Sequence, residues 1–260
     1  MDELARNRGR SRAAARRAAL VRPRAPRRHP RRHDTSHVKH GKLAAAATLA
    51  VALAAGGCGG SSHPAATTPA PQSGSSCADV PAPKPRTPGT QKAPPARLDP
   101  SKRWTLTFRT SCGEFVVLLQ PRTSPRATAS LVALARARYF DDTVFHRIVP
   151  GFVIQGGDPT QTGRGGPGYT TVDTPGPSTH YLKGVVAMGK TATAPRGASG
   201  SQFFVMTADA PSLAPDYAVV GRVIRGMATV ERIGKLGDAS DPNGTPTKVV
   251  VIESVTAGSR

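Results

Sequence analysis

Short apolar runs, punctuated by turns of glycine, proline and aspartate, recur along the chain from Trp104 to its end. The first two runs, WTLTFRT and EFVVLLQ, are separated only by SCG, which predicts a β-hairpin. The later runs are TVFHRIV, GFVIQGG, GVVAMGK, SQFFVMT, YAVVGRVI and KVVVIESV. Because such runs have the length of strands and are interrupted by turn residues, the pattern predicts a mainly β domain, either a barrel or a sandwich.

Two segments of the same domain carry helix signals instead. Ser124 followed by Pro125 is typical of an N-cap and a first helical residue, and apolar residues then recur at helical spacing, which predicts a helix over 125–138. A second, shorter helix is predicted over 227–236, ended by Gly237. The folded domain is therefore expected to span residues 102–258 and to combine many strands with two helices.

The first 101 residues lack the large apolar side chains that a core needs. Residues 1–42 hold 14 Lys and Arg against three acids, which accounts for +11 of the chain's net charge of +20. This segment has no aromatic side chain to stack on bases, so we expect no nucleic-acid partner. Residues 58–101 are rich in Pro, Ser and Thr, and this composition predicts a disordered linker.

A weakly hydrophobic segment joins these two regions. Residues 43–57 read LAAAATLAVALAAGG after basic side chains, so residues 1–57 are interpreted as a basic N-terminus with a signal peptide. Cys58 follows small residues and resembles the lipobox of bacterial lipoproteins, although Ala55 stands where leucine is usual. We expect an exported protein whose lipid on Cys58 anchors it to the outer face of the cell membrane. A single membrane helix over 43–57 is the alternative.

Cys77 and Cys112 remain once Cys58 is set aside. In an oxidising compartment these two are candidates to form a disulfide, and two free thiols are the alternative that stays open. The chain has no Cys-x-x-Cys spacing, and four histidines that could suggest a metal lie in the basic segment: His29, His33, His37 and His40. We therefore expect neither a metal site nor a cofactor.

Two stretches of the β-rich domain resemble the cyclophilin family of peptidyl-prolyl isomerases. They are FDDTVFHRIVPGFVIQGGDPTQTGRGGPGY at 140–169 and GSQFFVMT at 200–207. The resemblance covers about residues 103–257 and implies a closed eight-stranded antiparallel β-barrel with a helix covering each end. It also implies an enzyme that accelerates rotation about the peptide bond preceding proline, with proline-containing polypeptides as partners.

The resemblance places the site in a groove on the outer face of the barrel. It implies Arg147 as the catalytic residue, because a fixed guanidinium can donate a hydrogen bond to the proline nitrogen as amide conjugation is lost. The resemblance also implies a set of substrate-binding positions: Phe152, Val153, Gln155, Gly189, Lys190, Gln202, Phe204, Leu213 and Tyr217. His146 adjoins the arginine but is interpreted as structural, because bond rotation requires no proton transfer.

Four of these positions depart from the residues common in the family. Gly189 and Lys190 stand where alanine and asparagine are usual, Tyr217 replaces a frequent histidine, and Val153 replaces a frequent methionine. The groove stays apolar, so these changes affect sequence preference rather than activity.

Other functions fit the sequence less well. GVVAMGKT at 184–191 matches the phosphate-binding pattern G-x-x-x-x-G-K-[ST], but its centre reads as a strand and a loop follows it instead of a helix. A proline-segment binding protein or chaperone with little turnover is the alternative that remains. We expect a monomeric isomerase that assists the folding of exported proteins.

Overall fold

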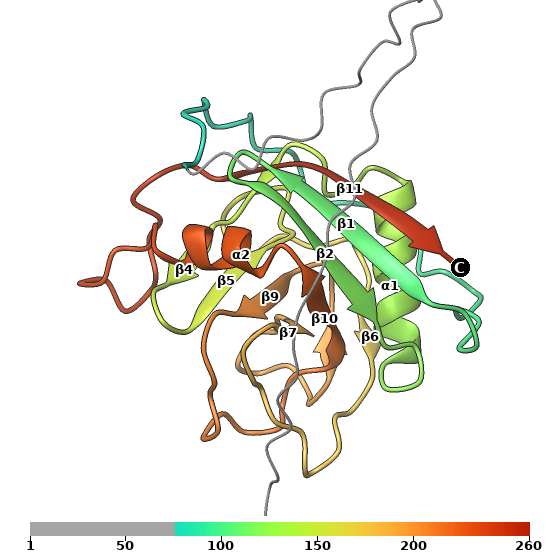
Figure 1. Cartoon of the computed structure of the whole chain (residues 1–260). Coiled ribbons are helices and arrows are strands. Elements are labelled where there is room, and N and C mark those ends of the chain that lie inside the picture. Colours follow the sequence, from blue (N-terminus) through green and yellow to red (C-terminus); the bar gives the residue numbers. More distant parts are fainter. Residues whose placement is uncertain (1–75) are drawn as a thin grey trace, which may run out of the picture. The chain divides into compact units, whose positions relative to one another are not determined.

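The computed structural model describes residues 76–260, so Cys58, the segment over 43–57 and the first part of the predicted linker lie outside the described residues. Eleven strands and two helices lie within this part of the chain (Figure 1). In chain order they are β1 (Trp104–Thr110), β2 (Gly113–Leu119), α1 (Pro125–Arg136), β3 (Thr143–Val144), β4 (Arg147–Val149), β5 (Val153–Gly156), β6 (Thr171–Val172), β7 (Val185–Met188), β8 (Ala198–Ser199), β9 (Phe203–Met206), β10 (Val219–Arg225), α2 (Met227–Gly234) and β11 (Val251–Ser259). The prediction of a mainly β domain with two helices is confirmed, and each helix ends two residues earlier than predicted.

Nine strands form one sheet in the order β3-β11-β1-β2-β10-β7-β9-β5-β4, and β6 pairs separately with β8. The edge strands β3 and β4 are only two residues apart in the chain, so the sheet curls strongly to bring its two edges round. Shifts of register between β10 and both of its neighbours add to this curl. The sheet is a curled half-barrel, and within residues 76–260 no pairing joins β3 to β4, so the closed eight-stranded barrel is not shown.

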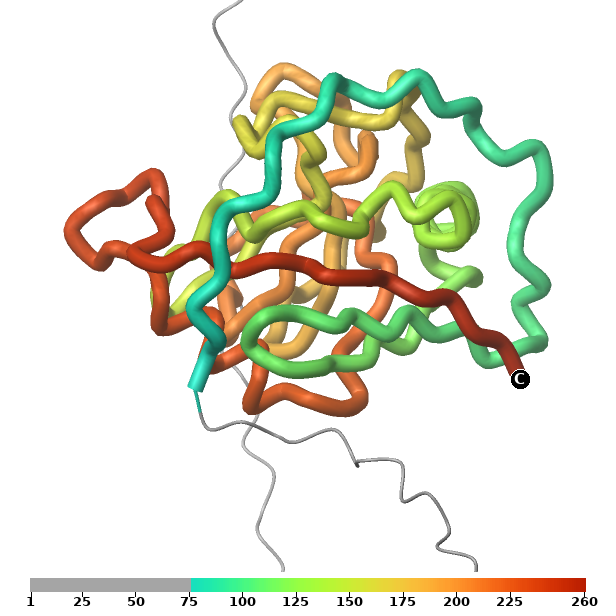
Figure 2. The backbone as a smooth tube through the Cα atoms, turned by 90° about the horizontal axis from the view of Figure 1, so that it is seen from above, coloured from blue at the N-terminus to red at the C-terminus, as the bar shows by residue number. Residues whose placement is uncertain are grey.

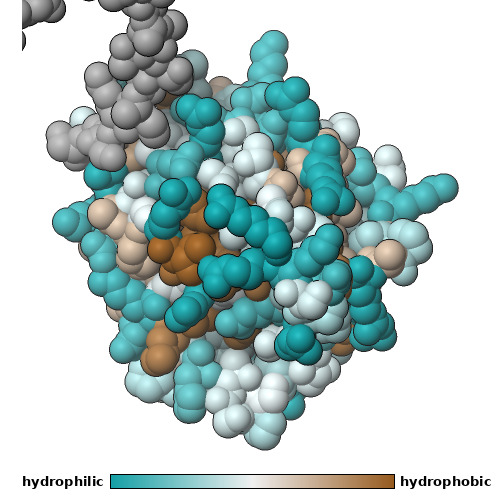
Figure 3. Space-filling view, turned by 45° about the vertical axis from the view of Figure 1, so that its right-hand side comes forward, coloured by the Kyte–Doolittle hydropathy of each residue, from teal (hydrophilic) through white to brown (hydrophobic). Residues whose placement is uncertain are grey.

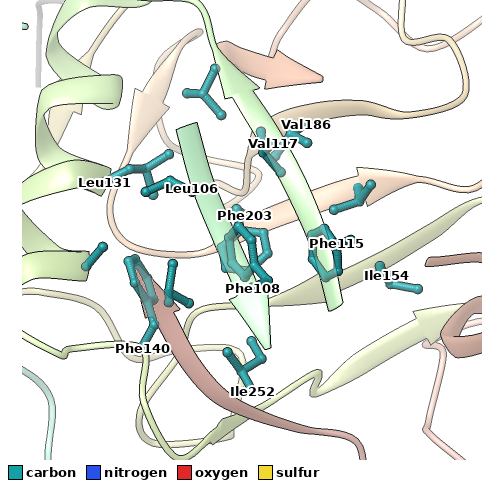
Figure 4. Packing of buried hydrophobic residues seen from close by; sticks show 14 of the residues in the cluster. Leu106, Phe108, Phe115, Val117, Leu131, Phe140, Ile154, Val186, Phe203 and Ile252 are labelled. Carbon is teal, nitrogen blue, oxygen red and sulfur yellow. The ribbon is translucent and has the colours of Figure 1, made fainter. Parts of the chain in front are cut away.

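Aromatic and branched side chains fill the inside of the curled sheet (Figure 4). Alternation along β1 sends Leu106 and Phe108 inward, where both are buried. Phe108 stacks on Phe115 with ring centroids 4.7 Å apart, and Phe203 lies 5.1 Å from Phe108 and 6.0 Å from Phe140. These packed rings hold together the strands whose outer faces carry the site described below.

The start of α1 is stabilised by a residue distant in sequence. The predicted cap, Ser124, does not cap the helix, because its hydroxyl donates instead to the Val219 carbonyl at 2.6 Å. An oxygen of Asp173 accepts from the backbone N–H groups of Arg126 and Ala127 at 2.9 and 2.7 Å. A carboxylate is well suited to this place, since it satisfies free N–H groups and faces the positive end of the helix dipole.

Residues 76–101, here called the strap, follow the surface of the domain and pass outside α1 (Figure 2). The strap contains no helix or strand. It is nevertheless held to the domain, since the Arg86 N–H donates to the Pro159 carbonyl at 2.8 Å and the Trp104 indole donates to the Asp99 carbonyl at 2.9 Å. The prediction of a disordered linker is therefore wrong for this stretch, because its partners are distant in sequence and composition does not reveal them.

A disulfide fastens the start of the strap to the turn of the first hairpin. It joins Cys77 to Cys112, so of the two alternatives left open by the sequence the structure contains the paired form. Next to it, the Ala78 N–H donates to the Ser111 carbonyl at 2.7 Å. A cross-link across a sequence separation of 35 stabilises the folded chain by about 3 to 4 kcal/mol on the chain-entropy estimate.

The surface of the described residues is mainly hydrophilic. Figure 3 shows one face on which small apolar patches lie among hydrophilic side chains. The large apolar side chains that are exposed are few and separate in sequence: Val172, Leu182 and Ile224. Over residues 76–260, neither helix has the length and apolar character needed to cross a membrane.

Candidate active site

A pocket of about 250 Å³ on the outer face of the sheet gathers nine of the ten residues implied for catalysis and substrate binding. We call it the Arg147 pocket, and its lining is Arg147, Phe152, Val153, Gln155, Gly189, Lys190, Phe204, Leu213 and Tyr217. Its apolar members pack in a cluster separate from the main core, and this cluster includes Val153 and Phe204. The tenth residue, Gln202, does not line the pocket, but its side chain accepts a hydrogen bond from Gln155.

Strand register explains why the pocket side chains meet. Arg147 of β4 lies opposite Gln155 of β5, and Gln155 lies opposite Phe204 of β9. Side chains of directly opposed residues lie on the same face of a sheet, so these three form a row across three strands. The neighbours Ile154 and Phe203 alternate to the other face, where they are buried in the main core.

Arg147 brings a half-buried positive charge to one end of this row. Its Nε donates to the Asn243 carbonyl at 3.0 Å, which fixes the guanidinium. Among the ion pairs of residues 76–260, none includes Arg147. Burial lowers the pKa of Arg147, but an arginine remains protonated at neutral pH, so the pocket holds a cation with donors free for a ligand.

Lys190 lines the same pocket, but unlike Arg147 its charge is paired with a carboxylate of the protein. Its side chain is only 6% exposed, and its Nζ lies 2.7 Å from a carboxylate oxygen of Asp216. The same Nζ donates to the Ala194 carbonyl at 3.1 Å and lies 5.7 Å from the centre of the Tyr217 ring. Lys190 therefore fastens the loop that carries Tyr217, and sequence reasoning missed Asp216 because no local pattern links the two.

Two glutamine side chains connect the pocket to a second hollow. Gln155 Nε2 donates to Gln202 Oε1 at 3.0 Å, and Gln202 Nε2 donates to the Gly165 carbonyl at 2.9 Å. The second hollow, of about 500 Å³, is lined by residues 163–170 and 198–202 and by Pro88 of the strap. We call it the strap-side hollow, and it shares three lining residues with the Arg147 pocket: Gln155, Gly189 and Lys190.

His146 lies beside Arg147 in sequence but does not line the pocket. Both of its ring nitrogens are buried and have no hydrogen-bond partner within the part of the chain that is described. Burial lowers the pKa of His146, and the nearby Asp158 carboxylate offsets this only in part. The ring is therefore neutral at pH 7, and its interpretation as a structural residue remains a prediction.

Two other kinds of chemical site can be compared with the structure: a metal site and a phosphate-binding loop. Over residues 76–260, no cluster of three His, Cys, Asp or Glu side chains could hold a metal ion. The G-x-x-x-x-G-K-[ST] match spans β7, and α2 does not follow until after three further strands, β8, β9 and β10. A phosphate-binding loop must open onto a helix, so this match has the wrong structural context.

Within residues 76–260, the curled antiparallel sheet thus carries an outer pocket lined by several apolar side chains and by Arg147, which forms no ion pair in that part of the chain. The family model "Cyclophilin type peptidyl-prolyl cis-trans isomerase/CLD" matches residues 105–257. This chain therefore belongs to the cyclophilin-type peptidyl-prolyl cis-trans isomerase family, and its enzyme class is peptidyl-prolyl cis-trans isomerase.

Curated relatives and solved structures agree with this assignment. Peptidyl-prolyl cis-trans isomerase A of Mycobacterium tuberculosis is 38% identical over 170 residues, covering 58% of this chain and 91% of the relative. A peptidyl-prolyl cis-trans isomerase of Arabidopsis thaliana is 39% identical over 135 residues, covering 50% and 80%. The crystal structure of a cyclophilin-type isomerase of Cryptosporidium parvum, obtained in the presence of the dipeptide Ala-Pro, matches with 30% identity and a TM-score of 0.54, covering 60% of this chain and 99% of the other.

Proposed function

We propose that the Arg147 pocket is the isomerase active site. The observation that carries this proposal is the row of Arg147, Gln155 and Phe204 across three paired strands, because it sets a guanidinium that forms no ion pair within residues 76–260 beside an apolar wall. Rotation about an X-Pro bond meets a barrier of about 20 kcal/mol, which arises from amide conjugation. No covalent bond is broken, so the site has to stabilise the twisted amide selectively and needs no nucleophile.

The pocket residues contribute in two ways, by apolar contact with the proline ring and by electrostatic stabilisation of the twisted amide. Phe152, Phe204 and Leu213 hold the proline ring by apolar contact. Arg147 donates a hydrogen bond to the proline nitrogen as that nitrogen loses conjugation and gains basicity. Gln155 holds the backbone of the residue before proline. A preorganised charge-assisted contact of this kind, in a half-buried site, contributes roughly 10² to 10³ in rate.

A peptide experiment distinguishes this site from the rest of the surface. An Ala-Pro peptide is expected to shift the backbone NMR signals of the Arg147 pocket, since the relative from Cryptosporidium was crystallised in the presence of Ala-Pro. An Ala-Ala peptide of equal length is the control and is expected to shift none. Shifts confined to residues outside the two neighbouring hollows would place the binding site elsewhere.

A binding protein or chaperone with little turnover is the second candidate function. It would use the same pocket to hold proline-containing segments. The presence of Arg147, which forms no ion pair within residues 76–260, favours turnover, because holding a proline ring requires only the apolar wall. The two candidates differ in one observable, the rate of cis-trans exchange of the bound peptide.

We further infer that the enzyme works outside the cell as a monomeric lipoprotein and assists the folding of exported proteins. Support comes from the signal-like segment over 43–57, from Cys58 after small residues, and from the Cys77–Cys112 disulfide, since disulfides persist in oxidising compartments. After cleavage before Cys58 the chain keeps 22 Lys and Arg and 13 Asp and Glu. A lipid on Cys58 and the residues after it would then hold the domain at the outer face of the membrane.

Cys58→Ser tests this localisation. The variant is expected to lose the membrane association of the wild type or to accumulate as an unprocessed precursor, because serine cannot carry the thioether-linked lipid. Membrane fractionation with mass spectrometry measures both outcomes, and Cys77→Ser is the control that leaves the lipobox intact. A Cys58→Ser protein that stays membrane-bound at the wild-type mature mass would favour an uncleaved membrane helix over 43–57.

A further inference from the structure

The strap runs beside a loop of residues 158–168, which leads from β5 toward β6 and which we call the hollow loop. Three backbone N–H groups of the strap donate to carbonyls of this loop at 2.8 to 2.9 Å: Arg86 to Pro159, Gly89 to Gly166, and Gln91 to Pro167. In the opposite direction, Gln161 Nε2 donates to the Pro83 carbonyl at 2.8 Å. The two segments thus share a ladder of bonds although they are more than 70 residues apart in sequence.

The contact between strap and loop is also a close steric fit. A Cβ added at Gly89 would lie 2.7 Å from Tyr139 Cε2 and 3.3 Å from Pro167 Cα, so a larger residue there would have to displace the Tyr139 ring or the strap. From the other side, a Cβ added at Gly168 would lie 2.6 Å from the Gly89 carbonyl oxygen. Arg86 adds a further anchor, since its Nη2 donates to the Tyr139 carbonyl at 2.6 Å.

The hollow loop has no helix or strand of its own. On its inner side an Asp158 carboxylate oxygen accepts from the Thr160 N–H at 2.8 Å and the other from the Gly165 N–H at 3.0 Å. The Gly165 carbonyl in turn accepts from Gln202, which accepts from Gln155 of the Arg147 pocket. The position of the loop is therefore linked to the pocket through two amide side chains, while the strap supports its outer side.

The lining of the strap-side hollow indicates what it can hold. Residues 163–170 and 198–202 are mostly glycine, serine and threonine, and at about 500 Å³ the hollow is larger than the Arg147 pocket. Because the two share lining residues and an extended chain advances about 3.3 Å per residue, a peptide of several residues can occupy both at once. An X-Pro dipeptide that binds in the Arg147 pocket is expected to leave most of the strap-side hollow empty.

We propose that the strap is a specificity-determining element of this enzyme. By fixing the hollow loop, and by placing Pro88 in the lining, it shapes the strap-side hollow for the residues that flank the X-Pro unit. The substrates it favours are extended polypeptides whose flanking side chains are small or polar. This inference rests on the proposed function of the Arg147 pocket. A dipeptide substrate is expected to depend on that pocket and little on the strap-side hollow, so it distinguishes failure of the one proposal from failure of the other.

Gly89→Val in the full chain tests the strap directly. The added side chain is expected to lift the strap from the hollow loop, which lowers kcat/KM for eight-residue Ala-Pro peptides about fivefold, mainly through KM, since lost hydrogen bonds and contacts weaken ground-state and transition-state binding alike. With a blocked Ala-Pro dipeptide, kcat/KM is expected to stay within about twofold of wild type. Exchange NMR measures the isomerisation rate of each substrate. Two versions of the longer peptide are compared, one with Ala-Pro near its N-terminus and one with Ala-Pro near its C-terminus.

The matched control is Gly176→Val, where an added Cβ meets nothing within 4 Å. It is expected to leave both substrates unchanged. Arg86→Ala, which removes the side-chain anchor of the strap, provides a second variant should Gly89→Val fail to fold, and it is expected to show the same dependence on peptide length. Equal losses for the dipeptide and the longer peptides, or no loss for either, would overturn the proposal for the strap. Loss of dipeptide turnover in Arg147→Ala reports separately on the proposed function.

Discussion

Arg147→Ala is expected to lower kcat/KM for an Ala-Pro peptide by about 100- to 1000-fold, because in the proposed mechanism Arg147 supplies the charge-assisted donor to the twisted amide. The domain is expected to stay folded, since Arg147 is half-buried in an open pocket and its side chain makes a single hydrogen bond within residues 76–260, to the Asn243 carbonyl. The loss should fall mainly on kcat, because apolar contacts to the proline ring remain. Exchange NMR gives the rate, and circular dichroism checks the fold.

Arg147→Lys is the matched control for this result. It keeps the positive charge but loses the planar fork of donors, so an intermediate activity is expected. If Arg147→Ala retains more than about half of wild-type activity, the assignment of Arg147 as the catalytic residue is wrong. A variant that is inactive and also unfolded would be replaced by Arg147→Gln, which preserves more of the side-chain volume.

Truncation of Phe203 is expected to affect mainly stability, whereas truncation of Phe204 is expected to affect mainly substrate binding, although the two residues are neighbours in β9. Phe203 is 1% exposed and packs against three other phenylalanine rings, so Phe203→Ala is expected to lower the free energy of unfolding by about 3 to 5 kcal/mol. Phe204 forms the wall of the Arg147 pocket, so Phe204→Ala is expected to cost less stability, about 1 to 2 kcal/mol, because solvent can fill the space that it leaves.

The activities of the two variants should show the reverse order. Phe204→Ala is expected to raise KM for proline peptides at least tenfold, since the proline ring loses its main apolar contact. Phe203→Ala, assayed where it is still folded, is expected to keep KM near the wild-type value, and Phe203→Leu serves if the alanine variant does not fold. Urea unfolding and steady-state kinetics together measure the pair. Equal effects on stability and KM in both variants would contradict the assigned faces of β9.

Local patterns predicted most of the strands, because alternation and turn residues are properties of short segments. The hairpin between β1 and β2 and the start of α1 at Pro125 are of this kind. Asp173 could not be predicted as the cap of α1, since only the folded chain brings it to the helix. The short strands β6 and β8 were missed for the same reason, because two-residue pairings leave no periodic signal.

The Arg147 pocket was predictable because its residues lie in two long matching stretches and a few nearby positions. Those stretches do not contain the residues that hold the pocket and the neighbouring hollow in place. Asp216 pairs with Lys190, and Pro88 of the strap lines the neighbouring hollow. The strap was predicted to be disordered from its proline-rich composition. That prediction failed because composition does not reveal the hydrogen bonds that the strap forms with residues 159–167.

Acceleration of rotation about X-Pro bonds by the Arg147 pocket is the activity that we propose. Its most direct test is the cis-trans exchange rate of an Ala-Pro peptide, measured by exchange NMR with the purified protein at one-hundredth of the peptide concentration. Uncatalysed exchange takes tens to hundreds of seconds, and the enzyme is expected to bring it to about one second or less. Saturable binding of the peptide in the Arg147 pocket with an unchanged exchange rate would contradict the account and identify a binding protein instead.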